Sequence, residues 1–350
     1  MKRALLAVLL VSALGGTQRL WAGAGAEPLD FLFLDADARA VAMGGAYTAL
    51  AANANALLYN PAGLARVRVH EATFMHSQSY QDIRQEYAAF AAKQGWGVNV
   101  NHLSFGDVPR TTISNPEGSG LSSTGLSDLA LGAGYGLRVG DALALGLGGK
   151  FIRESIAGVS AQGYALDLGA LYDPSLIEGL TFGAALQNVG PAIRFQKARE
   201  NLPLNMRAGA AYGVLVRDRR CSIALDFSKE RSESTAFMSV GLEVFPAERM
   251  PLRLGYSSRN DAGPGITAGI GYQLADFSVD YAFVPYGALG NAHRISATVR
   301  WGGSVSARRE PVLKPAALPK RIIPVSPATP VPPKRAKASA SPAQDAEISE

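Results

Sequence analysis

Apolar side chains alternate with small or polar ones along most of this chain, and the alternation limits the folds that it can adopt. Between Asp128 and Val139, the odd positions carry Leu, Ala, Tyr or Val, and the even positions are mostly Ala and Gly. Successive side chains of a strand point to opposite faces, so this pattern predicts a β-strand with one apolar face. Similar segments predict about 14 strands, at 67–78, 84–94, 97–106, 128–139, 143–151, 164–172, 180–187, 204–214, 223–227, 238–244, 252–256, 266–274, 277–283 and 294–301.

The distribution of bulky residues indicates which face of the sheet meets water. A soluble β-sandwich buries its bulky face and exposes a charged one. In this chain the face opposite the bulky one is rich in Gly and Ser and poor in charge, and aromatic residues tend to lie near strand ends. Transmembrane barrels have this pattern, apolar outside and polar inside. We therefore predict an all-β fold, a transmembrane antiparallel β-barrel of about 14 strands with a small N-terminal helical plug, or hatch.

The predicted connections alternate between short and long. The short ones include Gly95-Trp96, Gly140-Asp141 and Ala275-Asp276. The long ones are 107–126, 155–161, 189–203, 229–234, 258–264 and 285–292. Outer-membrane barrels have short periplasmic turns and longer external loops. We therefore expect a protein of the bacterial outer membrane, and the even strand number places both chain ends in the periplasm.

Residues 27–66 precede the first predicted strand, lack this alternation and are expected to form the plug. Small residues dominate them, a Gly-Gly pair interrupts them, and an Asn-Pro turn ends the plug and leads into the first strand. Glycines permit close packing against a wall that is itself rich in Gly. The residues that we expect at this gate are Arg39, Met43, Gly44, Gly45, Tyr47, Asn60, Pro61, Ala62 and Gly63.

The third predicted strand is irregular. Val98 and Val100 share one phase of the alternation, whereas Leu103 and Phe105 share the other. A change of phase predicts a bulge between the two pairs, near Asn101-His102. Such a bulge either opens the wall sideways or only shapes the barrel. The residues at a lateral opening would be Asn99, Asn101 and His102.

Charged residues recur on the face of the predicted strands that points into the barrel. They are Asp128, Arg138, Lys150, Asp167, Arg207, Asp226, Glu243, Arg253, Asp280, Arg294 and Arg300. A charge inside a barrel either meets water or pairs with an opposite charge. We expect these side chains to pair with one another and with the plug, or to be solvated in the lumen. A specific solute site is the alternative.

The two ends of the chain differ from the barrel at 67–302. Residues 1–26 predict a secretory signal peptide, because Lys2 and Arg3 precede an apolar core and small residues follow it. That core is too short to span a bilayer as a helix. Residues 303–350 are rich in Pro, Ala and Lys and predict a disordered periplasmic tail, either passive or a tether to a partner.

The sequence lacks motifs for catalysis, metals, cofactors or nucleic acids. The run from Gly146 to Lys150 is followed by Phe151 rather than Ser or Thr, so it does not match a phosphate-binding loop. The single Cys221 excludes a cysteine-rich metal site. Much of the net charge of +5 comes from the last 50 residues, which argues against a nucleic-acid surface on the barrel. We predict no enzymatic activity, no metal, no cofactor and no nucleic-acid partner.

Several short motifs together resemble a known family of outer-membrane proteins. The plug is similar to that of the FadL-like outer-membrane transport proteins, which carries an Asn-Pro-Ala motif. A closer resemblance, over residues 28–302, is to the PorV/PorQ family. The motifs that carry it are Ala38-Arg39-Ala40, Tyr59-Asn60-Pro61-Ala62-Gly63-Leu64, Leu254-Gly255-Tyr256-Ser257-Ser258, Val279-Asp280-Tyr281-Ala282-Phe283-Val284-Pro285, Leu289-Gly290 and His293-Arg294-Ile295-Ser296.

The resemblance implies a 14-stranded barrel with a hatch, and two alternative functions. PorV-like proteins serve the type IX secretion system and shuttle exported proteins that carry a C-terminal signal. FadL-like proteins move hydrophobic molecules by way of a kinked third strand. We expect the first, a protein-interaction component of secretion or attachment, and keep a plug-gated channel for hydrophobic small molecules as the alternative. The expected partners are outer-membrane lipid with secreted proteins or secretion-system components, or a hydrophobic ligand.

Overall fold

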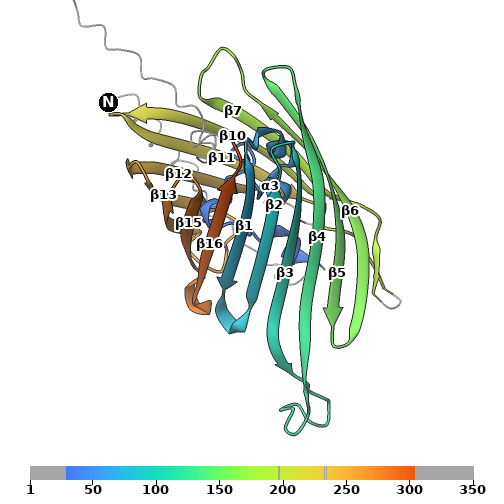
Figure 1. The fold of residues 1–350 in the computed structure, drawn as a ribbon. Helices are drawn as coiled ribbons and strands as arrows, with labels where there is room; N and C mark the ends of the chain where they lie inside the picture. Colours follow the sequence, from blue (N-terminus) through green and yellow to red (C-terminus); the bar gives the residue numbers. More distant parts are fainter. Residues whose placement is uncertain (1–28, 196–197, 232, 234, 304–350) are drawn as a thin grey trace, which may run out of the picture. The chain divides into compact units, whose positions relative to one another are not determined.

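The computed structural model describes residues 29–195, 198–231, 233 and 235–303. Within these residues, fourteen antiparallel strands close into a barrel (Figure 1). The fold class and the strand number are therefore confirmed. The strands of the barrel are β1 (His70–Gln78), β2 (Arg84–Ala91), β3 (Trp96–Pro109), β4 (Ser123–Val139), β5 (Leu143–Ile156), β6 (Val159–Tyr172), β7 (Leu180–Val189), β10 (Asn205–Val216), β11 (Arg219–Glu230), β12 (Phe237–Ala247), β13 (Met250–Ser257), β14 (Ile266–Gln273), β15 (Phe277–Pro285) and β16 (Asn291–Trp301).

Each strand pairs with its neighbour in the chain, and the first and last strands close the barrel. β1 pairs with β16 along its whole length, with His70 opposite Trp301 at one end. β7 pairs directly with β10, because β8 (Ile193–Phe195) and β9 (Ala198–Glu200) form a separate two-stranded sheet in the connection between them. The alternation did not predict this small hairpin. Among the described residues, no helix is long and apolar enough to cross a membrane.

The bulky side chains of the strands point out of the barrel. On β6, Tyr164 exposes 67% of its surface and Leu166 exposes 53%, whereas Ala165 between them exposes 3%. Exposed Leu, Ile, Phe and Tyr residues recur on β4, β5, β7, β11, β13 and β14. Large apolar surfaces are rare on proteins that face water, whereas a membrane barrel carries such a band toward lipid. The predicted direction of the alternation is therefore observed.

Residues 29–67, which we call the N-terminal segment, lie inside the barrel (Figure 1). The segment consists of short helical turns joined by irregular chain. These turns are η1 (Asp30–Phe33), α2 (Ala38–Ala42), α3 (Ala56–Tyr59) and η2 (Pro61–Arg66). Every residue from 36 to 64 is buried except Leu58. The position of the segment agrees with a plug, but its role as a hatch stays a prediction.

Polar side chains set where the helical turns of the segment begin. The Asp37 carboxylate accepts a hydrogen bond from the Arg39 amide at the start of α2. Asn60 caps η2 in the same way, through the Ala62 amide, and Pro61 occupies the first turn. Asp and Asn are favoured at such positions because they satisfy amides that have no partner within the helix. Asn60-Pro61 thus starts a further helical turn. The sequence had indicated that Asn60-Pro61 ends the segment, and this prediction is wrong.

Glycines let the N-terminal segment approach the wall closely. A Cβ on Gly146 of β5 would lie 2.1 Å from the Ala62 amide nitrogen. A Cβ on Gly44 would lie 2.5 Å from the main-chain oxygen of Tyr256 on β13. Both distances are shorter than van der Waals contact, so any side chain there would push the segment away from the wall. Of the predicted Gly pair, Gly44 packs against the wall and Gly45 packs within the segment itself.

The bulge predicted near Asn101-His102 is wrong. β3 pairs with both neighbours without interruption as far as Ser104, and its register shifts only between Ser104 and Asp107. Leu103 and Phe105 point into the barrel and pack with apolar residues of the N-terminal segment. The prediction assumed that every bulky strand residue points out of the barrel. This assumption is wrong at Leu103 and Phe105, because the interior of the barrel is apolar there.

The connections differ between the two ends of the barrel. At one end, here called the short-turn end, the barrel begins with β1 and finishes with β16, and most turns have two to four residues. The other, long-loop end carries η3 (Tyr80–Asp82), η4 (Gly287–Leu289) and the two longest connections, 110–122 and 190–204. One predicted loop is wrong: 155–161 is mostly strand, because β5 and β6 continue to a tight turn at Ala157-Gly158.

The predicted division of the chain is only partly covered by the described residues. The signal peptide at 1–26 and the tail from 304 to 350 lie outside them. The boundaries between plug, barrel and tail stay predictions.

The close approach of β5 to the N-terminal segment can be tested with two glycines of that strand. Gly146→Ala places a methyl group against Ala62, and we expect a loss of about 1–3 kcal/mol in the free energy of unfolding. Gly149→Ala is the matched control, because its Cβ would have no neighbour closer than 3.9 Å. Urea unfolding followed by heat-modifiable gel mobility measures both. Equal stability of the two variants would contradict this packing.

Candidate functional site

A buried ion-pair network fastens the N-terminal segment to the wall. Arg39 on α2 donates from Nε and Nη2 to the two carboxylate oxygens of Glu243 on β12, at 2.9 and 2.8 Å. Glu243 also accepts a hydrogen bond of 2.7 Å from Nε of Arg253 on β13. Arg253 donates from Nη1 to Asp280 on β15 at 2.6 Å. Through Glu243 the segment is therefore connected to three strands of the wall.

A second carboxylate holds the main chain of the segment. Oδ2 of Asp226 on β11 accepts hydrogen bonds from the amides of Tyr47 and Thr48, at 3.0 and 2.9 Å. Arg207 on β10 donates from Nη2 to the same oxygen at 3.2 Å and to the Gly45 carbonyl at 2.7 Å. Nε of Arg207 donates to the Thr48 hydroxyl at 2.9 Å. The turn from Gly45 to Thr48 is thus held by its backbone as well as by its side chains.

Asn60 makes a third attachment without using a charge. Its Nδ2 donates to the carbonyl of Thr48 within the segment, at 3.1 Å, and to that of Ala170 on β6, at 3.0 Å. On the same side of the barrel, Gln187 of β7 donates to the Leu58 carbonyl at 2.7 Å. Amide side chains therefore satisfy the backbone of the segment where the ion pairs do not reach.

Aromatic rings fill the middle of the segment. The Tyr47 hydroxyl accepts hydrogen bonds from Nη1 of Arg39 at 3.3 Å and from Nδ2 of Asn53 at 3.1 Å. The Tyr47 and Tyr59 rings meet edge to face, with centroids 5.0 Å apart. Burial raises the pKa of Tyr59 well above its ordinary value, so this phenol stays neutral. The other predicted gate residues buried in this region are Met43, Ala62 and Gly63.

Buried ion pairs of this kind set position more than they add stability. Desolvation of the charges offsets most of their attraction, but removing one partner leaves an uncompensated charge and costs about 3–5 kcal/mol. Arg39, Glu243 and Arg253 each expose 2% of their surface or less. The N-terminal segment therefore has one favoured position, and it can move only if these pairs separate.

The other predicted lumen charges behave in different ways. Lys150 on β5 pairs with Asp167 on β6 at 2.9 Å, as expected. Asp128 lies opposite Glu154 on β5 and has no ion pair within the described part of the chain. Arg138 is exposed at the short-turn end and does not join the buried network. The predicted pairing is thus observed for most of these charges but not for all of them.

The structure does not bring the three residues of the predicted lateral opening together. Asn99 and Asn101 point into the barrel, where they bind Tyr87 at 3.4 Å and Gln85 at 3.0 Å. His102 belongs to the opposite, outward phase of β3. Strand pairing is intact at all three residues, and an opening at this point stays a prediction.

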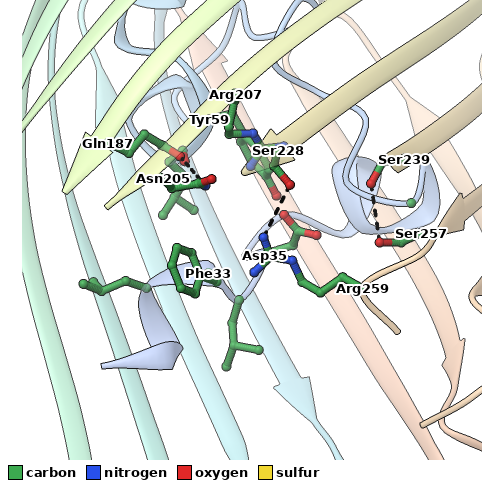
Figure 2. A pocket seen from close by; sticks show the side chains of 14 residues that line it. Phe33, Asp35, Tyr59, Gln187, Asn205, Arg207, Ser228, Ser239, Ser257 and Arg259 are labelled. Carbon is green, nitrogen blue, oxygen red and sulfur yellow. Dashed lines mark hydrogen bonds between the residues drawn. The ribbon is translucent and has the colours of Figure 1, made fainter. Parts of the chain in front are cut away.

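A narrow polar cleft lies beside the N-terminal segment, facing the inner wall (Figure 2). Its volume is about 40 Å³. Hydroxyl groups line one side, where Ser239 of β12 donates to Ser257 of β13 at 3.4 Å. The labelled polar residues around the rest of the cleft are Asp35, Tyr59, Gln187, Asn205, Arg207 and Ser228. A cleft of this size holds water but not an aromatic or lipid molecule.

Arg259 covers the cleft from the loop between β13 and β14. Its guanidinium lies 4.9 Å from the ring centroid of Phe33 and 4.7 Å from that of Phe237. It donates to the Ser228 hydroxyl at 3.5 Å, as Figure 2 shows, and pairs with Glu230. Reasoning from the sequence missed this residue, because strand alternation does not show which loop side chains turn inward.

The sequence of this chain matches the model of a known protein family. The family model for "Type IX secretion system protein PorV" matches residues 24–233, well over half of the chain. The chain belongs to the PorV family. Membership confirms the resemblance seen in the sequence, and the chain is an outer-membrane β-barrel. None of the curated proteins compared with it matches.

Solved structures that resemble this PorV-family chain include a monoaromatic hydrocarbon channel and a toluene transporter. The "CymD monoaromatic hydrocarbon channel" is 12% identical, with a TM-score of 0.52 over 77% of this chain and 98% of that one. The toluene transporter TodX of Pseudomonas putida is 13% identical, with a TM-score of 0.49 over 76% and 98%. At such low sequence identity, the similarity to the CymD structure shows that the two chains share a fold, but it does not show which ligands this chain binds.

The ion-pair network of this PorV-family barrel can be tested by removing its central charge. Glu243→Gln keeps the shape of the side chain but removes the negative charge that pairs with Arg39. We expect the N-terminal segment to leave the wall more often, so that trypsin cleaves after Arg39 about tenfold faster or more. Mass spectrometry of timed digests measures the cleavage.

The matched control for this test is Glu117→Gln. Glu117 is exposed in the 110–122 loop and has no ion pair among the described residues. Cleavage at the wild-type rate in both variants would show that Glu243 does not hold the segment.

Proposed function

We propose that this protein is a non-enzymatic component of type IX secretion that binds proteins at its long-loop end, while the N-terminal segment closes its lumen. The observation that carries the proposal is the filled lumen of a PorV-family barrel. Three sets of polar contacts hold the segment in place, and the polar cleft beside it has a volume of only about 40 Å³. A barrel sealed in this way is suited to act through its outer surfaces.

The surface that favours protein binding is the hairpin of β3 and β4. β2 pairs with β3 only as far as Ser104, and β5 pairs with β4 only from Leu126. The chain between these residues extends beyond the neighbouring strands (Figure 1). Both of its edges therefore have free backbone groups, which can add a strand from a partner. Near its tip, Ile113 is fully exposed.

The proposed orientation places this hairpin outside the cell. Barrels of the outer membrane have short periplasmic turns and longer external loops. β1 begins and β16 ends at the short-turn end, so both chain ends would be periplasmic. A secretory signal at residues 1–26 would bring the chain to that compartment, and outer-membrane lipid would surround the apolar band.

A channel for hydrophobic molecules is the second candidate. An apolar cluster inside the barrel favours it, formed by Leu29 and Phe31 with Leu103, Ile152 and Ile193. However, the side chains of the N-terminal segment themselves fill this space. Passage of a solute would require the segment to leave Glu243 and Asp226, which makes this function secondary. Neither candidate calls for a metal, a cofactor or a nucleic acid.

Shortening the hairpin distinguishes the two candidates. Replacing residues 105–126 with an Asn-Gly turn removes the projecting strand edges and their loop, whereas Ser104 and Ser127 still pair across the new turn. In the native organism, we expect export of proteins that carry the type IX signal to fall at least tenfold, and uptake of radiolabelled toluene to stay unchanged. Immunoblots of the medium and cell surface measure export.

The matched control changes the tight turn between β5 and β6 at the same end, Ala157-Gly158, to Asn-Gly. This variant should export normally, since Asn-Gly suits a two-residue hairpin turn. Normal export by the hairpin variant would contradict the proposed function. Loss of toluene uptake with export intact would favour the channel.

A further inference from the structure

A second cleft lies at the short-turn end of the barrel, where its volume is about 580 Å³. Volumes of this order are typical of sites that bind a ligand of moderate size. Four parts of the chain form the cleft: residues 49–52 of the N-terminal segment, residues 66–68 before β1, the turn between β4 and β5, and the connection from β6 to β7. Its apolar lining residues include Leu50 and Leu180.

One ion pair ties the two sides of this cleft together. Arg66, at the end of η2, donates from Nη2 to both carboxylate oxygens of Asp173 at 2.9 Å. Asp173 also accepts a hydrogen bond of 2.6 Å from the Thr181 hydroxyl. The connection from β6 to β7 is therefore fixed to the N-terminal segment, and the charge of Asp173 is already used.

The rim of the cleft combines free charges with exposed apolar side chains. Arg68, Arg138, Asp141 and Glu178 line it, and none of them has an ion pair in the ranges that the structure describes. Ile177 also lines it and exposes 50% of its surface, and the adjacent Leu176 exposes 95%. Apolar side chains exposed in a turn, beside polar groups, mark surfaces that bind proteins.

The charges and apolar side chains of the rim indicate which kind of molecule can bind in this cleft. A purely apolar molecule would bury four unpaired charges, which is costly. A simple anion would meet Asp141 and Glu178, and a simple cation would meet Arg68 and Arg138. A peptide that carries both charges and an apolar residue satisfies all of these groups.

We propose that this cleft binds a peptide segment of a protein partner, which inserts an apolar side chain beside Leu50 and Ile177 and pairs charges of both signs with the rim. The site lies at the end opposite the β3–β4 hairpin, so the inference does not rest on the proposed function. Residues 49–52 directly follow Tyr47 and Thr48, which Asp226 holds. The occupant therefore contacts the same segment that fills the lumen.

Two fluorescein-labelled hexapeptides test the proposal, Glu-Glu-Leu-Phe-Lys-Lys and Glu-Glu-Ser-Ser-Lys-Lys. Each is titrated into the full-length protein in detergent, and thermophoresis measures binding. We expect the Leu-Phe peptide to bind at least tenfold more tightly than the Ser-Ser peptide. The double variants Leu176→Ser/Ile177→Ser and Arg68→Gln/Arg138→Gln should each weaken its binding at least fivefold.

Leu289→Ser is the matched control, because Leu289 of η4 is an exposed apolar residue at the other end of the barrel and lies outside the β3–β4 hairpin. It should leave binding unchanged, and heat-modifiable gel mobility shows that every variant is folded. Equal binding of the two peptides would overturn the proposal. So would unchanged binding by both double variants, or an equal loss in Leu289→Ser, which would indicate nonspecific apolar contact.

Discussion

The carboxylate of Glu243 is the interaction on which the interior of this barrel depends. It pairs with Arg39 of the N-terminal segment and with Arg253 of the wall, and Arg253 also pairs with Asp280, so that two positive and two negative groups balance. These groups are buried away from water, so none of them can lose its partner without a large cost. The lumen therefore contains a segment whose position is set by charge and not by apolar packing alone.

Close packing and hydrogen bonds hold the N-terminal segment in place together with the ion pairs. Gly146 leaves room for the backbone near Ala62, and Asp226 satisfies two amides of the segment that water cannot reach. Because the barrel is filled in this way, the two surfaces that we propose for binding lie at its ends. The hairpin at one end and the cleft at the other both present exposed apolar residues, Ile113 and Leu176.

The sequence was sufficient to predict the barrel but not the contacts inside it. Lipid requires apolar side chains on every second strand residue, as in Tyr164 and Leu166, so the strands are visible as a pattern. The interior has no such rule, and Leu103 and Phe105 were misplaced for that reason. The alternation predicted that Glu243 points into the barrel, and a motif predicted that Arg39 belongs to the plug. No local sequence pattern predicts that these two residues, 204 positions apart, form an ion pair. Arg259 and the β6–β7 cleft depend on loop conformation, which alternation does not report.

Electrical conductance across a planar lipid bilayer tests most directly whether the N-terminal segment seals the barrel. The purified wild-type protein should insert without forming a steady ion-conducting pore. A variant that lacks residues 29–66 but still folds as a barrel should conduct continuously, because these residues form the main buried cluster inside the barrel. Steady conductance by the wild-type protein, equal to that of the shortened variant, would contradict the account.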